Sequence, residues 1–175
     1  MDKKYYIEIV PLEKERDILD SLADHNPKSF SKHDTGYDWL EEDDSKCIVF
    51  DNPYSGSPLE IDVGDDGRFT LFFSEHHAHY EAYQGDYEDM LMRISDIFSN
   101  NVCTATIKDY KGKWYGSCFL PKEESNKSAQ EIFEFVFKED EFRNHLNKHG
   151  YSYSLNYWDP RFNKTVQVKS ESFNQ

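Results

Sequence analysis

The sequence predicts an α+β fold, with about three helices packed on one face of a largely antiparallel sheet. Three observations support this prediction. Apolar and polar residues alternate in several short segments, as they do in half-buried strands. Turn sequences such as Asp66-Gly67 join most of these segments, which favours antiparallel hairpins. Other segments repeat apolar residues at helical spacing, as amphipathic helices do.

The first hundred residues contain the clearest hairpin. Leu59, Ile61 and Val63 alternate with acidic residues before the turn at Asp66-Gly67, and a second strand follows from Arg68. The elements expected in this part are a strand over 5–10, a helix over 12–24, a loop over 25–45, strands over 46–50, 59–63 and 68–74, an extension of the sheet over 75–83, and a helix over 87–99 with Asp86 as its N-cap.

In the rest of the chain, a helix is predicted to begin at the capping box Ser128-x-x-Glu131 and to end at Gly150. A kink or break near 139–140 is compatible with this pattern. The other elements expected here are strands over 102–108, 113–120, 151–158 and 164–168. The length of 175 residues and the lack of a linker predict a single domain over 1–175.

The composition limits the classes of partner. The chain has 34 acidic and 20 basic residues, a net charge of −14, which disfavours direct binding to nucleic acid or to an anionic membrane. Aromatic residues make up 16% of the chain, unlike disordered acidic proteins. Three cysteines without framework spacing, no long apolar run and no apolar leader predict a cytoplasmic protein without disulfides. No cofactor is expected.

The acidity is uneven. Residues 1–100 contain 24 acidic and 9 basic residues, whereas residues 101–175 contain 10 and 11. One interpretation is solvated loops and helix starts; the other is an acidic surface that attracts a basic partner. Aromatic side chains border these clusters and are typical interface anchors, although they also cap cores. The candidate partner-binding residues are Trp39, Glu41, Glu42, Asp43, Asp44, Asp62, Asp65, Asp66, Tyr80, Tyr83, Asp86, Glu88 and Asp89.

A histidine cluster gives the one candidate for metal chemistry. On a strand, Glu75, His77 and His79 share a face, which would give a site with two imidazoles and one carboxylate. The alternative is an ordinary exposed strand, because no complete metal-ligand spacing is present. A calcium loop starting at Asp62 is rejected, since its twelfth position is Phe73 instead of a glutamate.

Three segments carry a resemblance to a protein family. They are Phe72-Phe73-x-Glu75-His76-His77-Ala78-His79-Tyr80, Asn101 to Ile107, and Gly112-Lys113-Trp114-Tyr115-Gly116-Ser117. Over about residues 69–120, the chain resembles small acidic bacterial immunity-type proteins encoded beside polymorphic toxins. The resemblance implies a non-catalytic inhibitor of a partner toxin, and it transfers no binding residues.

The leading hypothesis is therefore a non-catalytic protein that occludes a basic partner toxin. A nuclease would suit this hypothesis, because an enzyme that binds phosphates presents a basic cleft. Two alternatives stay open. One is a metal-binding protein or metal-dependent enzyme centred on Glu75, His77 and His79, and the other is a structural or regulatory interaction module.

Overall fold

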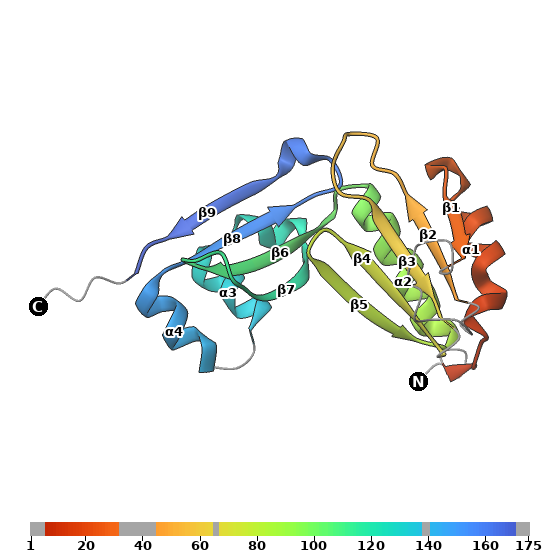
Figure 1. Cartoon of the computed structure of the whole chain (residues 1–175), viewed down its shortest axis with the longest axis horizontal. Helices are drawn as coiled ribbons and strands as arrows, with labels where there is room; N and C mark the ends of the chain where they lie inside the picture. Colours follow the sequence, from red (N-terminus) through yellow and green to blue (C-terminus); the bar gives the residue numbers. More distant parts are fainter. Residues whose placement is uncertain (1–5, 32–44, 65–66, 138–140, 171–175) are drawn as a thin grey trace, which may run out of the picture. The chain divides into compact units, whose positions relative to one another are not determined.

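The computed structural model describes residues 6–31, 45–64, 67–137 and 141–170. The chain divides into two compact units, Met1–Ser95 (unit 1) and Asp96–Gln175 (unit 2), which are described one at a time (Figure 1). Over the described residues the strands form two antiparallel sheets, of five and four strands, with four α-helices. The predicted α+β class is confirmed. A single domain over 1–175 stays a prediction.

Unit 1 is built on a meander, in which every strand pairs with its neighbour in sequence. Its sheet has the order β1-β2-β3-β4-β5 (Figure 1). The strands are β1 (Lys28–Ser31), β2 (Lys46–Phe50), β3 (Leu59–Val63), β4 (Arg68–Phe73) and β5 (His76–Glu81). The helices are α1 (Glu15–Ser21), between the 3₁₀ turns Pro11–Lys14 and Ala23–His25, and α2 (Gln84–Phe98).

One side of this sheet holds the core of unit 1. Alternate residues of β3 and β4 are fully buried there, as the alternation in the sequence predicts. The ring of Phe69 on β4 lies 5.5 Å from that of Tyr87 on α2. The ammonium of Lys14, just before α1, lies 5.2 Å from the same Tyr87 ring. Ser29 of β1 also donates a hydrogen bond to Glu15 of α1, so both helices lie on this side.

Unit 1 differs from the sequence prediction at its N-terminal elements. The segment 5–10 contributes only an isolated bridge between Glu8 and Tyr83. The helix over 12–24 is divided into 3₁₀, α and 3₁₀ turns. The predicted loop contains β1, whose polar sequence Lys-Ser-Phe-Ser has no hydrophobic alternation. Helix α2 begins at Gln84, so Asp86 lies in its first turn instead of serving as its N-cap.

Unit 2 has a sheet of order β7-β6-β8-β9 (Figure 1). The strands are β6 (Val102–Asp109), β7 (Trp114–Pro121), β8 (Tyr151–Asn156) and β9 (Lys164–Val168), and the helices are α3 (Ala129–Val136) and α4 (Glu141–His149), with 3₁₀ turns at Lys122–Asn126 and Pro160–Phe162. The predicted capping box is confirmed at α3, where Ser128 Oγ accepts from the Glu131 amide and Glu131 accepts from the Ser128 amide. The long predicted helix is two helices.

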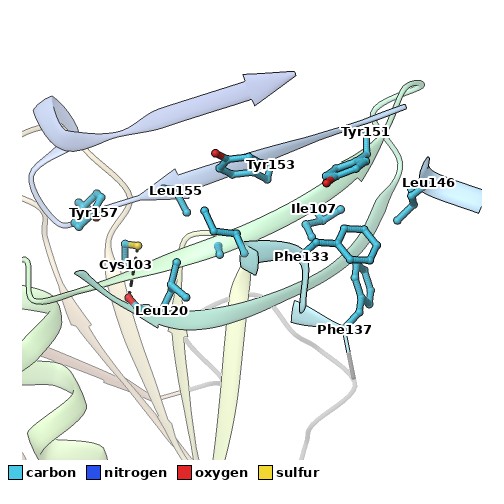
Figure 2. Close-up of a cluster of buried hydrophobic side chains, with 12 residues drawn as sticks. Cys103, Ile107, Leu120, Phe133, Phe137, Leu146, Tyr151, Tyr153, Leu155 and Tyr157 are labelled. Atoms are coloured by element: carbon cyan, nitrogen blue, oxygen red, sulfur yellow. Dashed lines mark hydrogen bonds between the residues drawn. The ribbon is translucent and has the colours of Figure 1, made fainter. Parts of the chain in front are cut away.

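The core of unit 2 is rich in aromatic rings. Figure 2 shows side chains from β6, β7 and β8 meeting Phe133, Phe137 and Leu146 of the α3–α4 segment. The Phe133 ring lies 4.8 Å from Phe137 and 5.1 Å from Tyr151. Cys103 belongs to this core and donates a hydrogen bond to the Leu120 carbonyl oxygen. Burial raises the pKa of this thiol to about 11, so it is a poor nucleophile at neutral pH.

Among the residues that the structure describes, no helix combines the length and the apolar composition needed to cross a bilayer.

Candidate functional site

The side of the unit 1 sheet opposite α1 and α2 is called the outer face. Cross-strand partners in an antiparallel sheet point to the same side, so the strand registers identify its members. They are Lys28, Phe30, Cys47, Val49, Glu60, Asp62, Arg68, Thr70, Phe72, His77, His79 and Glu81. Most of these side chains are exposed or half-buried, whereas the alternate residues of β3 and β4 fill the core.

One row of the outer face joins an acid, a hydroxyl and an imidazole. Asp62 on β3 lies opposite Thr70 on β4, and Thr70 lies opposite His79 on β5. Thr70 is buried, and its Oγ1 lies 3.0 Å from Nδ1 of His79. This hydrogen bond fixes the orientation of an otherwise exposed imidazole, because the hydroxyl is anchored in the middle of the sheet.

The neighbouring row of the outer face contains two aromatic side chains, Phe72 and His77. Glu60 lies opposite Phe72, and Phe72 lies opposite His77. The Phe72 and His77 ring centroids are 5.6 Å apart, and the His77 ring meets the His79 ring edge to face at 5.1 Å. The result is a cluster of three rings with carboxylates beside it on β3. Such a surface combines flat contact area with hydrogen-bonding groups, as protein interfaces do.

Only two of the three predicted metal ligands, His77 and His79, lie together on the outer face. His77 and His79 share the outer face as predicted. Glu75, however, lies in the two-residue turn between β4 and β5, where Ser74 has a positive φ of 54°, and therefore does not continue the β5 face. In the described part of the chain, no three histidine, cysteine, aspartate or glutamate side chains are grouped so that they could hold a metal ion.

The predicted partner-binding residues other than the two tyrosines fall into three groups. Trp39, Glu41, Glu42, Asp43, Asp44, Asp65 and Asp66 lie outside the described residues. Asp62 lies on the outer face. Asp86, Glu88 and Asp89 lie on the first turns of α2, on the helix side of the sheet. The described acidic residues therefore occupy two sides of unit 1.

Local hydrogen bonds explain the placement of the α2 carboxylates. Asp86 Oδ2 accepts from the backbone N–H of Glu81 at 3.0 Å, which ties the end of β5 to the helix start. Glu88 Oε1 accepts from the side-chain amide of Gln84 at 2.8 Å, one helical turn earlier. The N-terminal half of a helix also favours negative charge because of the helix dipole. These two carboxylates therefore have a role in local structure.

The two predicted tyrosine anchors are half-buried. Tyr80 is on the helix side of β5, and its hydroxyl hydrogen-bonds to Arg93 of α2. Burial is the main reason why the pKa of Tyr80 is raised. Tyr83 forms the bridge with Glu8, and its ring contacts Tyr6 edge to face at 6.4 Å. Both positions suit rings that cap the core. Capping of the core was the alternative to a role as interface anchors in the sequence analysis.

The charge of the chain coincides with its division into units. Unit 1 contains 23 acidic and 9 basic residues, a net charge of −14, and unit 2 contains 11 of each. The entire net charge of the protein therefore belongs to unit 1. A basic partner would be attracted to unit 1 in preference to unit 2.

Some outer-face residues were not among the sequence candidates. Glu60 and Glu81 are acidic and share this face with Asp62, and Phe72 and Thr70 support the two histidines. The alternation along β3 was the signal that could have identified Glu60, because Glu60 and Asp62 both alternate with the buried apolar residues of that strand.

The chain matches no protein-family model, no curated protein and no solved structure.

Proposed function

We propose that this chain is a non-catalytic binding protein of the immunity type, which attaches to a basic protein partner through the outer face of unit 1. The observation that carries the proposal is the confinement of the net charge of −14 to unit 1. A strongly acidic unit accelerates encounter with a cationic protein and rejects anionic competitors.

The outer face supplies contacts suited to such a partner. Glu60, Asp62 and Glu81 are carboxylates that accept hydrogen bonds from lysine and arginine. Phe30, which is 40% exposed, lies on the same face as His77 and His79 and adds flat contact area. Aromatic groups near the centre of an interface commonly supply much of its affinity.

The basic side chains of this face reduce its charge only in part. Lys28 is paired with Asp51 in an ion pair. Arg68 lies directly opposite Glu81 across β4 and β5, where opposite charges attract. Glu60 and Asp62 lie on β3, the middle strand of the sheet, between the outer-face residues of β2 and β4. A charge reversal at these two carboxylates therefore tests the centre of the proposed interface.

The inhibitory mechanism would be steric. A protein that covers the basic cleft of a toxin excludes the toxin's anionic substrate without any reaction of its own. A nuclease fits this description because phosphate binding requires cationic side chains.

The test begins with the native partner. Tagged protein is used to purify its partner from the source cells, and the association rate with that partner is measured over a range of salt concentrations. The double substitution Glu60→Lys/Asp62→Lys is expected to slow association about tenfold at low salt and to flatten the salt dependence. If the partner is a toxin, co-expression of the wild-type chain relieves its growth arrest.

The matched control is Glu123→Lys/Glu134→Lys in unit 2, which makes the same change in net charge at two exposed positions. It is expected to change the association rate less than twofold. Equal effects of the two double substitutions would contradict an interface on the outer face. A partner without toxic activity would favour the alternative of a regulatory interaction module.

A further inference from the structure

Unit 2 contains a cavity of about 200 Å³, remote in sequence from the strands of the outer face. Three short segments form it: the 3₁₀ turn Lys122–Asn126, the end of β8 with the residue after it, and the connection from Pro160–Phe162 into β9. The lining residues are Lys122, Ser125, Asn126, Leu155, Tyr157, Phe162 and Lys164.

The apolar part of the cavity is held in place by the fold. Leu155 and Tyr157 belong to the buried core of unit 2. The Phe162 ring, which is 51% exposed, stands nearly perpendicular to the Tyr157 ring at a centroid distance of 6.1 Å. Two aromatic rings and a leucine therefore form an apolar surface that a flat group can contact.

Hydrogen bonds from backbone amides to side-chain oxygens preorganise the loop that carries Phe162. Asp159 Oδ1 accepts from the Arg161 amide at 3.0 Å and caps the 3₁₀ turn. Asn163 Oδ1 accepts from the Tyr157 amide at 2.7 Å and ties the loop back to the end of β8. A ligand entering the cavity would not have to order this loop, which lowers the entropic cost of binding.

The polar part of the cavity is cationic. Lys122 and Lys164 are its two charged lining residues, and none of the seven is acidic. Over the described residues neither lysine forms an ion pair. The Lys122 ammonium lies 5.5 Å from the centroid of the Phe162 ring, so one positive charge adjoins the aromatic wall. Two unpaired cations next to aromatic rings favour an anion that carries a flat apolar group.

The hydroxyl groups of the cavity are mostly occupied within the protein. Ser125 Oγ donates to the Lys122 carbonyl oxygen at 2.6 Å. Tyr157 hydrogen-bonds to Ser125 and Cys103, and burial raises its pKa to about 12, so it is neutral. Recognition of an anion would therefore depend on the two ammonium groups and the Asn126 side-chain amide.

We propose that this cavity is a binding site for a small organic anion, a single aromatic ring bearing a carboxylate or phosphate group. The ring would lie against Leu155, Tyr157 and Phe162, and the anionic group would lie between Lys122 and Lys164. A volume of about 200 Å³ is below the range of sites for drug-sized ligands, which favours one ring over a nucleotide. The site is independent of the proposed interface in unit 1.

The test uses benzoate and phenyl phosphate as probes, with amide chemical shifts from NMR as the readout. Both probes are expected to shift the amides of residues 122–126 and 162–164, with a Kd of ~1 mM for benzoate. Phenyl phosphate is expected to bind more tightly because it has more negative charge. Benzyl alcohol, which has the ring without the charge, and acetate, which has the charge without the ring, are each expected to bind at least tenfold more weakly.

Substitutions distinguish binding of benzoate in this cavity from unspecific attraction of the anion to surface lysines. Lys122→Gln/Lys164→Gln is expected to weaken benzoate binding at least tenfold, whereas Lys169→Gln, an exposed lysine outside the lining, is expected to leave it unchanged. Phe162→Ala is expected to reduce the preference for benzoate over acetate. Equal binding of benzoate to the double variant, equal binding of benzyl alcohol or acetate, or no shifts up to about 10 mM benzoate would each overturn the proposal.

Discussion

Replacing Phe133 with alanine is expected to destabilise unit 2 strongly. Phe133 has no exposed surface, and its ring packs on Phe137 at 4.8 Å and on Tyr151 at 5.1 Å. The guanidinium of Arg143 also lies 5.9 Å from the ring centroid. A buried Phe→Ala change typically costs about 3–5 kcal/mol, and the lost ring contacts place this site in the upper part of that range.

Thermal unfolding followed by circular dichroism measures the effect. At roughly 2–4 °C per kcal/mol for a chain of this size, a cost of about 4–5 kcal/mol should lower the midpoint by about 8–20 °C. Phe135→Ala, on the same helix α3, is the control. Phe135 is 41% exposed and contacts Lys127, so its loss should cost about 1 kcal/mol or less. Similar midpoints for the two variants would refute the assignment of Phe133 to the core.

Two further predictions concern close packing and protonation. Gly116→Ala places a Cβ 2.9 Å from Cε1 of Phe137, and this overpacking is expected to cost about 1–3 kcal/mol in a urea titration; an unchanged midpoint would show that Phe137 can move. Burial lowers the pKa of His76 from 6.5 to about 4, with the nearby His77 and Arg93 adding to it. The unfolded chain therefore binds the proton first, and His76 contributes stability that is lost as the pH falls from about 6.5 to 4. His76→Gln is expected to reduce the fall in melting temperature between pH 7 and pH 5; parallel pH profiles for wild type and His76→Gln would contradict the prediction.

Much of the fold follows from local sequence signals. The β3–β4 hairpin combines strict alternation with an Asp-Gly turn, and the start of α3 has a complete capping box. Both signals depend on residues a few positions apart, so they survive in the structure. Strand β1 could not be predicted, because Lys-Ser-Phe-Ser becomes a strand only through pairing with β2.

The candidate site was predictable in part. Parity along β5 places His77 and His79 on one face, and the structure agrees. The same rule would have placed Tyr80 on the opposite face, which is where it packs against Arg93. The cavity of unit 2 has no sequence signature, since Lys122 and Lys164 are brought together only by the pairing of β8 with β9 and by the turn after β7.

The strand order of the two sheets has a consequence for the order of folding. In unit 1 each strand pairs with the strand made just before it, so loop closures are short and pairing can follow synthesis of the chain. In unit 2 the inner pair joins β6 to β8, with Asp109 opposite Tyr151, so this sheet is incomplete until α3 and α4 have been made. We therefore expect the acidic unit to form on the ribosome while the β6–β7 hairpin still lacks its partner strand.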